Sequence, residues 1–430
     1  MKMGDSDEWK NYVNDPRMVC KYSSKCYQKN PEHHKRFKHP PLKIGKAINR
    51  AKGRLSPYAR PSPRGSPARQ ERHLSPSGNS EETMTKSDDV TVDSKPEQVD
   101  KPEPEDQTVI ELPEKIAFYD KSTDNSLLKE LFLVEMPDDF FKFFECISEC
   151  GKTFEETLSS VNLMAIGPFE LLMGKLPNLD NKELYLVHWR FFYDPPEFQA
   201  VLKKKKDSQY HIGYFRDDPK ETPVFVASND CEKNYHITPM ACNLFGAVYK
   251  YLQNEKKHSP FTSMACQKLM DKVKAYAEKN NISLEEFNMK KRLAKVVTKS
   301  LHGAGIMVPY DKKTQLGYRR LAETDASLKK MFEKLEKATS KTEKMEVLSE
   351  LQPVITNINI ALDESDFGTG IEGGIALFCS GLQELAQPAM SCLISAYSVL
   401  NRKAFGDIIK AHIKYRRKGP NVSLLHMSAS

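Results

Sequence analysis

Apolar residues recur at helical spacing in the first segment expected to be ordered, which begins near Val109. The tripeptide Pro-Asp-Asp at 137–139 precedes a run that predicts a capped helix with a broad apolar face, made by Phe140, Phe141, Phe143, Phe144, Ile147 and Cys150. Between 185 and 226 the pattern changes, because aromatic and β-branched residues are interrupted by Asp-Pro-Pro and Asp-Asp-Pro. This second segment predicts short antiparallel strands.

Helical spacing returns in the second half of the chain. Ser263 is expected to cap one helix, Ser283 with Glu286 has the spacing of a capping box for another, and a third is expected from Thr324 through Leu335. Pro353 is expected to mark a first turn or a break before apolar residues at helical spacing, which are Ile355, Ile358 and Leu362. The predicted fold class is therefore α+β, with antiparallel strands followed by a mainly helical part.

The distribution of charge predicts a long unfolded segment. The chain has 430 residues and a formal net charge of +7, but 35–72 is strongly basic with three Ser-Pro steps and a fourth following at Ser75, and 81–114 is mainly acidic. Neither stretch has enough apolar residues to fold. A basic arm of this kind suits weak nonspecific contact with nucleic acid and resembles a nuclear import signal, and a merely solvated linker is the alternative.

These patterns together divide the chain into five parts. We expect a small finger at 15–41, a disordered linker at 42–108, an α+β domain at 109–260, a mainly helical domain at 261–418 and a flexible tail at 419–430. No cleavable apolar leader and no membrane-spanning run is recognisable, so we expect an intracellular protein with no membrane partner. Cys146 and Cys150 are expected to be small core residues.

Two cysteines and two histidines near the N-terminus have the spacing of a metal site. The motif is C-x5-C-x6-H-x5-H, and its members are Cys20, Cys26, His33 and His39. Two thiolates and two imidazoles are the ligands of a closed tetrahedral zinc site. The segment has little apolar core, so zinc is expected to supply its folding free energy. The spacing differs from that of DNA-reading fingers.

The finger resembles the poly(ADP-ribose)-binding zinc finger. Residues that match the family pattern around the four ligands are Arg17, Tyr22, Tyr27, Asn30, Pro31, Phe37 and Pro40. The resemblance implies that Tyr22, Tyr27 and Gln28 contact the nucleotide, with the two rings as stacking faces. The chain departs from the family at Gln28, usually Arg, and at Ser23, usually Gly. The alternative is a finger kept only for folding.

Candidate chemistry in the helical part rests on Arg319 and on the adjacent pair Asp363-Glu364. Two neighbouring carboxylates that leave a helix for a Gly-rich turn cannot share one helical face, so one can meet a partner and the other a reacting group. By itself this is a weak signal, and an acidic turn that is only solvated is the alternative. No phosphate-binding loop and no nucleophile elbow is found.

Over about residues 110–415 the chain resembles the histone PARylation factor family. The matching blocks are HWRFFYDPPEF at 188–198, GYFRD at 213–217, VVTK at 296–299, HGAG at 302–305, GYR at 317–319, ETDA at 323–326 and DESDFGTG at 363–370. The resemblance implies a factor that joins a poly(ADP-ribose) polymerase and directs it to serine. It assigns Glu364 as the catalytic base, with Asp363 and Arg319 essential at the joint site.

The same resemblance implies partners and a location. NAD is used only through the partner polymerase, the substrates are histones and other chromatin proteins, and the protein acts in the nucleus, on chromosomes at sites of DNA damage. The chain is not expected to be an enzyme alone. Two other function classes stay open: a non-catalytic reader or scaffold of poly(ADP-ribose), and a hydrolase of ADP-ribosyl bonds, which lacks a second partner acid.

Overall fold

The computed structural model describes residues 14–20, 30–39, 113, 115–149, 151–258 and 260–426. The finger and the remainder of the chain, here called the body, are described separately. The finger has two short paired strands and one helix, which are β1 (Met18–Val19), β2 (Phe37–Lys38) and α2 (Pro31–Arg36). The predicted linker at 42–108 lies outside the described residues.

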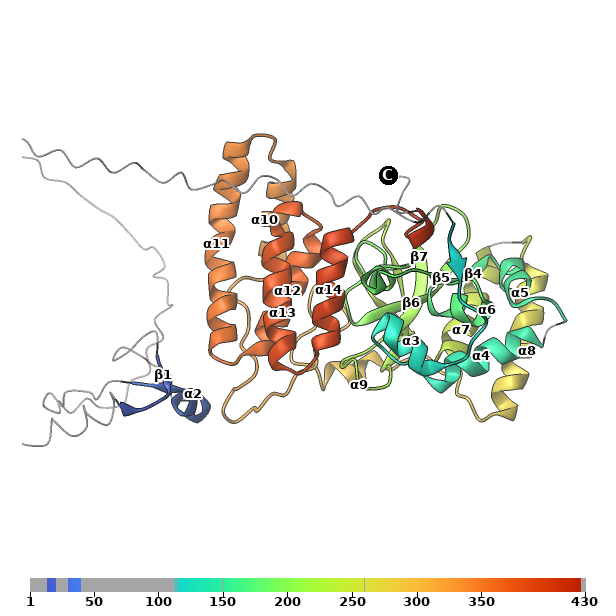
Figure 1. The fold of residues 1–430 in the computed structure, drawn as a ribbon, viewed down its shortest axis with the longest axis horizontal. Coiled ribbons are helices and arrows are strands. Elements are labelled where there is room, and N and C mark those ends of the chain that lie inside the picture. Colours follow the sequence, from blue (N-terminus) through green and yellow to red (C-terminus); the bar gives the residue numbers. More distant parts are fainter. Residues whose placement is uncertain are drawn as a thin grey trace, which may run out of the picture. The chain divides into compact units, whose positions relative to one another are not determined.

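The body begins with small helices around an antiparallel sheet (Figure 1). Five strands pair in the order β4-β6-β7-β8-β9, with bounds Leu163–Ala165, Phe198–Lys204, Tyr210–Phe215, Phe225–Asp230 and Thr238–Ala241. A second pair joins β3 (Ala117–Phe118) to β5 (Pro177–Asn178). The helical elements of this part are α3 (Asn125–Phe132), α4 (Asp138–Ser148), α5 (Phe154–Ser160), α6 (Pro168–Met173), η2 (Lys182–Leu186), α7 (Leu244–His258), α8 (Ser263–Lys279) and α9 (Met289–Leu293).

The rest of the body is helical (Figure 1). Its elements are α10 (Asp325–Lys337), α11 (Lys341–Asp363), α12 (Phe367–Ser380), η3 (Gln383–Leu385), α13 (Ala386–Val399), α14 (Lys403–Tyr415) and η4 (Leu424–His426). α12 packs against α13 and α11, and α13 packs against α14. Strands followed by helices confirm the α+β prediction. No helix in the described ranges is long and apolar enough to cross a membrane.

One buried apolar cluster extends through both parts of the body, from Leu128 to Leu424. α8 packs on α7, where the rings of Phe245 and Tyr276 stack at 5.5 Å. The expected division at residue 260 therefore falls between two helices that pack together. Residues 419–426, expected in a flexible tail, pack on the body, since Val422 is buried and its carbonyl accepts a 3.1 Å hydrogen bond from the Trp189 N–H.

Several local predictions are confirmed. The helix after residue 137 is α4, with Phe140, Phe143 and Ile147 buried, and Cys146 is a core residue while Cys150 lies outside the described residues. Thr324 caps α10, because its side chain accepts a 3.2 Å hydrogen bond from the Ser327 N–H. The strands predicted between 185 and 226 are antiparallel.

Other predictions are wrong in detail. The sheet strands begin at Phe198, since Tyr185 lies in η2, and they continue to Ala241. Pro137 is at the N-cap position of α4 but makes no capping hydrogen bond. Ser263 is the first residue of α8, where Thr262 is the N-cap and makes no side-chain capping bond.

The other two errors concern a turn and a proline. Ser283 and Glu286 cap no helix, because Glu286 forms a bridge to the strand residue Ala241 and α9 begins later, at Met289. Pro353 does not interrupt a helix or begin one, since α11 continues through it. The buried residues Leu351 and Ile358 on either side pack into the core, and this packing outweighs the hydrogen bond that proline cannot make.

Candidate functional site

The junction between α11 and α12 holds the two adjacent carboxylates. Asp363 is the last residue of α11, and Glu364 is its C-cap, with its N–H donating to the Ile360 carbonyl at 3.0 Å. Ser365 then adopts a positive φ of 72°, which turns the chain toward α12. Asp363 is exposed whereas Glu364 is buried. The two side chains therefore face different surroundings, as their adjacency predicted.

Arg319 reaches this junction from a loop that precedes α10. Its Nη2 lies 2.5 Å from Glu364 Oε2, and its Nε lies 3.1 Å from Asp366 Oδ2. One guanidinium thus neutralises two buried carboxylates with different nitrogens of its planar fork. The Arg319 side chain stays 35% exposed, while the Glu364 side chain is only 4% exposed. Arg319 therefore forms an internal ion pair that can order the junction.

The backbone of the loop that carries Arg319 is hydrogen-bonded to side chains at the start of α12. The Arg319 N–H donates to Thr369 Oγ1 at 3.0 Å, and the Thr369 hydroxyl donates back to the Arg319 carbonyl at 2.6 Å. The Gly317 N–H donates to Asp366 Oδ1 at 3.1 Å. Gly317 has a φ of 103°, and a Cβ there would lie 2.1 Å from the Pro309 carbonyl oxygen, so no other residue fits.

Tyr318, beside Arg319, is fixed by a second buried carboxylate. Its hydroxyl donates to Glu372 Oε2 at 3.1 Å, and the Thr298 hydroxyl donates to Glu372 Oε1 at 2.7 Å. Burial raises the pKa of Glu372, and burial together with the nearby Glu372 carboxylate raises the pKa of Tyr318 to about 12. Tyr318 therefore keeps its proton at neutral pH and remains a hydrogen-bond donor.

The electrostatics of the junction are set by burial and by one cation. Burial raises the pKa of Asp366, and the Arg319 guanidinium opposes that rise. The ion pair between Arg319 Nη2 and Glu364 Oε2 fixes the orientation of the Glu364 carboxylate. A carboxylate held in a fixed direction beside an exposed acid is an arrangement that can accept a proton from a docked hydroxyl group.

Sequence reasoning found three members of this site and missed the groups that position them. Asp366, Thr369 and Glu372 were not assigned roles, although the first two lie in the DESDFGTG block. The available signal was Asp366, which is the N-cap residue of α12 and follows directly after the acidic pair. Glu372 gave no signal, because only the packed fold brings it to Tyr318 and Thr298.

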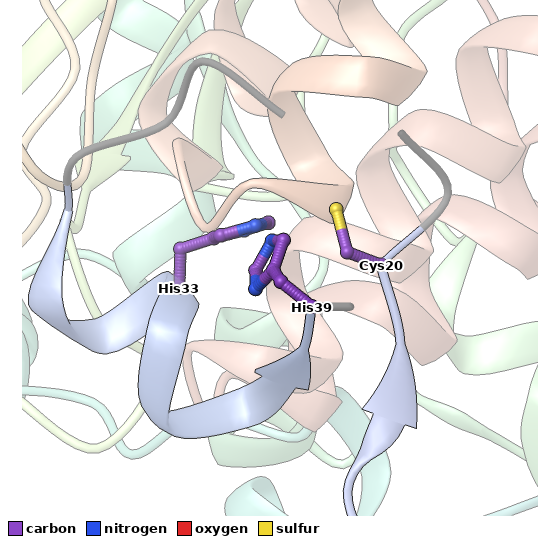
Figure 2. Close-up of side chains that lie close together, drawn as sticks. All are labelled: Cys20, His33 and His39. Carbon is purple, nitrogen blue, oxygen red and sulfur yellow. The ribbon is translucent and has the colours of Figure 1, made fainter. Parts of the chain in front are cut away.

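The finger brings three of the four predicted zinc ligands together. Figure 2 shows the side chains of Cys20, His33 and His39 grouped at one end of the finger, and their ligand atoms lie within 4.8 Å of one another. Cys20 follows β1, His33 lies on α2, and His39 follows β2. Pairing of the strands fixes this arrangement, since the Cys20 N–H donates to the Lys38 carbonyl at 3.0 Å.

The donor set fits zinc, because a thiolate and imidazole nitrogens are its preferred ligands. The helix that carries His33 has local reasons to form. The Asn30 side chain accepts a 3.0 Å hydrogen bond from the Glu32 N–H, and Pro31 occupies the first helical position. The fourth predicted ligand, Cys26, and the predicted nucleotide contacts lie outside the described residues; those contacts are Tyr22, Tyr27 and Gln28.

A second group with metal-ligand chemistry lies in the core, and sequence reasoning did not find it. The ligand atoms of Asp194, His211 and Cys231 lie within 4.8 Å of one another and all three residues are buried. His211 Nε2 lies 2.8 Å from Asp194 Oδ1, and the Asn229 amide donates to Asp194 Oδ1 at 3.2 Å and to Cys231 Sγ at 3.3 Å. We interpret the group as a hydrogen-bonded core network.

The part of the chain that contains the junction matches a known protein family. Residues 123–416, which include Arg319, Asp363 and Glu364, match the family described as histone PARylation factor 1. The chain belongs to the histone PARylation factor 1 family. Residues 17–42, which contain the finger, match a second family described as the PBZ domain. Membership supports a role as a histone PARylation factor, and the PBZ match supports zinc binding and poly(ADP-ribose) binding.

Curated relatives extend over most of the chain. Histone PARylation factor 1 of Danio rerio is 39% identical over 295 residues, which cover 67% of this chain and 84% of the relative. The protein of the same name from Mus musculus is 37% identical over 314 residues, with 70% and 90% covered. A putative histone PARylation factor 1-like protein of Homo sapiens is 34% identical over 315 residues, with 71% and 90% covered.

Proposed function

We propose that this protein completes the active site of a poly(ADP-ribose) polymerase and thereby directs ADP-ribosylation to serine in histones and other chromatin proteins. The observation that carries the proposal is the junction of α11 and α12, where Arg319 holds Glu364 while the neighbouring Asp363 stays exposed. Family membership supports a partner that carries out ADP-ribosylation. The partner supplies NAD, and this chain supplies a carboxylate.

Glu364 acts as the general base in this proposal. A serine hydroxyl is a weak nucleophile at neutral pH and gains reactivity when a base lies within about 2.6–3.2 Å of its proton. The serine oxygen forms a bond to the anomeric carbon of the nicotinamide ribose, the bond to nicotinamide breaks, and the proton passes to the Glu364 carboxylate. General-base catalysis typically contributes about 10²–10⁴-fold to such a rate.

Asp363 and Arg319 have supporting roles. The exposed Asp363 contacts the polymerase, where a carboxylate can pair with a cation. Arg319 orients Glu364 and ties it to Asp366, so that the base keeps one direction before the partner arrives. Because the Arg319 side chain is partly exposed, one face of its guanidinium also stays available to a docked protein.

The finger is proposed to bind zinc and the polymer that the partner makes. Zinc would be held by Cys20, Cys26, His33 and His39 and would stabilise the fold of the segment. Tyr22 and Tyr27 would stack on adenine rings, and Gln28 would contact the nucleotide. The finger would thus retain the protein on chromatin where poly(ADP-ribose) accumulates, which places its action in the nucleus, on chromosomes at sites of DNA damage.

A non-catalytic reader or scaffold is the second candidate. The observation that favours it is the Arg319–Glu364 ion pair itself, because a carboxylate already neutralised by a guanidinium can serve structure alone. The two candidates differ in whether serine-linked product depends on this chain.

The test is a reconstituted reaction of a poly(ADP-ribose) polymerase, NAD and a histone peptide, with and without the full chain. Product is assigned to serine or to acidic residues by its stability to hydroxylamine and by mass spectrometry. We expect serine-linked product only when the chain is present. If the chain binds poly(ADP-ribose) but does not change which residues are modified, the non-catalytic scaffold is the better account.

A further inference from the structure

The C-terminal end of α7 is a basic part of the surface of the body. α7 ends in Lys256, Lys257 and His258, and all three side chains are exposed. Phe261 follows and is fully exposed, at 101% of its reference area, and Met264 is 86% exposed. Two large apolar side chains are thus exposed close to a run of cations.

The turn between β6 and β7 adds further lysines to this end. Lys204 Nζ lies 2.9 Å from the Glu255 carboxylate, which places the turn beside the last residues of α7. The next side chain, Lys205, donates a hydrogen bond to the neutral Ser159 hydroxyl at the end of α5. Lys206 is exposed. Lys205 and Lys206 therefore have no carboxylate partner among the residues that the structure describes, whereas Lys204 is paired with Glu255.

A shallow cavity of about 360 Å³ joins α5 to α8 on the same side. Thr157 and Ser160 of α5 line it opposite Lys268 of α8. Lys152 and Lys272 are further cations in its lining, and Glu149 is the one acidic residue there, 4.0 Å from Lys272. Among the residues that the structure describes, Lys206, Lys257 and Lys268 form no ion pair with a carboxylate.

We propose that this surface, the lysine face, binds the phosphate backbone of duplex DNA. It consists of Lys152, Lys205, Lys206, Lys256, Lys257 and Lys268 with Phe261 and Met264 at its edge. Lysines without carboxylate partners on four neighbouring elements match a row of phosphates, because each neutralised phosphate releases a condensed counterion. Apolar side chains beside such cations are used by DNA-binding proteins as wedges at base steps of the minor groove.

The same features argue against other anionic partners. Single-stranded nucleic acid is usually held in a groove by several stacked aromatic rings, and this surface offers Phe261 alone. A membrane surface would need a broad apolar face, but beyond Met264 the large apolar residues of α8 point into the core, as shown by buried Leu269, Met270 and Val273. Duplex DNA requires mainly positive charge.

The location of the lysine face leaves the proposed catalytic junction free. Figure 1 shows α5 and α8 at the end of the body opposite α11 and α12, whose junction carries Glu364. A protein bound to DNA through this face can therefore still present Asp363 and Glu364 to a second protein. The inference does not depend on the role proposed for Glu364.

The experiment uses the full chain, so that the basic segment at 35–72 contributes equally to every variant. Binding to a fluorescent blunt-ended duplex is measured by anisotropy over a range of salt concentrations. The test variant is Lys206→Gln, Lys257→Gln and Lys268→Gln together. The matched control neutralises three exposed lysines around α10, Lys330→Gln, Lys337→Gln and Lys341→Gln. A third variant is Phe261→Ala.

We expect the test variant to reduce the slope of log affinity against log salt by about 0.9 for each lysine, while the control variant keeps the wild-type slope. Phe261→Ala should weaken binding without changing the slope. Equal losses in the test and control variants would overturn the proposal and assign binding to overall charge. The proposal would also be overturned if the test variant bound duplex DNA as well as the wild type does but no longer bound phosphatidylserine vesicles or purified poly(ADP-ribose).

Discussion

Arg319 and Glu364 are 45 positions apart in the chain, and the guanidinium and carboxylate lie 2.5 Å from each other at the start of α12. A second nitrogen of the same guanidinium, Nε, lies 3.1 Å from Asp366 Oδ2. The three residues that the sequence assigned to one site therefore lie close together, with Asp363 and Glu364 on one short turn and Arg319 on a loop that reaches Glu364.

Replacing Arg319 by lysine should disturb the junction although the charge is kept. A single ammonium group cannot contact Glu364 and Asp366 with two separated nitrogens. We expect Arg319→Lys to lower serine modification by at least about tenfold, which corresponds to about 1.4 kcal/mol, while the body stays folded, because lysine cannot orient Glu364 and hold Asp366 together. Product yield and thermal unfolding are measured in parallel. A fully active lysine variant would show that only charge is required.

Removing the exposed carboxylate should affect association. We expect Asp363→Ala to weaken binding to the polymerase by about 2–5 kcal/mol, because a cation of the partner would be left unpaired in the interface. Isothermal titration with the catalytic part of the polymerase measures the change. Asp120→Ala, which removes an exposed carboxylate elsewhere on the body, is the control. Equal affinity of both variants would exclude Asp363 from the interface.

Chelation of zinc should separate the finger from the body. The body has a continuous apolar core, whereas the finger is expected to depend on its zinc ligands for folding. We expect a chelator to abolish binding of poly(ADP-ribose) and to leave the thermal transition of the body and its accessory activity unchanged. One common unfolding transition that shifts with zinc would contradict the modular organisation.

The two tyrosines of the finger should carry polymer binding. Tyr22→Ala with Tyr27→Ala should abolish binding and retain zinc, since each stacking contact is worth about 1–3 kcal/mol. Gln28→Arg should tighten binding by restoring the residue usual in the family. Filter binding of purified polymer and zinc content by atomic absorption are the measurements. Normal affinity in the double variant would assign binding to the basic arm.

Buried histidine should make the body sensitive to acid. Burial lowers the pKa of His302 from 6.5 to about 3, and its Nδ1 accepts a 3.1 Å hydrogen bond from the Ala304 N–H. Below pH 6.5 this histidine is protonated in the unfolded chain but stays neutral in the folded chain. Its contribution to the free energy of unfolding is therefore full above pH 6.5 and is lost progressively toward pH 3. The loss between pH 6.5 and pH 5 is roughly 1–2 kcal/mol from this group.

His302→Asn keeps an acceptor and removes the titration, so urea unfolding of this variant should depend less on pH than that of the wild type. His258→Asn, at an exposed site, is the control and should keep the wild-type dependence. The comparison uses the change in unfolding free energy with pH, which is independent of any stability lost at neutral pH.

Sequence patterns predicted elements where a single period dominated. The helix of Phe140 and Phe143 and the helix capped by Thr324 were both predictable, since their signals are local. The errors arose where tertiary packing decides, as at Pro353, which lies inside a helix whose flanking residues are buried. Ser283 and Glu286 had the spacing of a cap but lie beside a strand.

The site was predictable to the extent that its members share a motif. Asp363 and Glu364 stand together in the sequence, and their opposite exposure follows from helical geometry. The partners of Arg319 and Tyr318 come from long-range packing, so neither Asp366 as a second ligand of the guanidinium nor Glu372 as an anchor of the tyrosine could be read from spacing.

The proposed catalytic role rests on one proton acceptor, and Glu364→Gln tests it. The amide keeps the shape of the side chain and can still accept a hydrogen bond from Arg319, but it cannot act as a base. Serine-linked product on a histone peptide and association with the polymerase are measured for this variant and for Glu333→Gln, an exposed site on α10. We predict that Glu364→Gln binds the polymerase and forms at least about 100-fold less product, while the control variant is unchanged. Near-normal product from Glu364→Gln would contradict base catalysis by this chain.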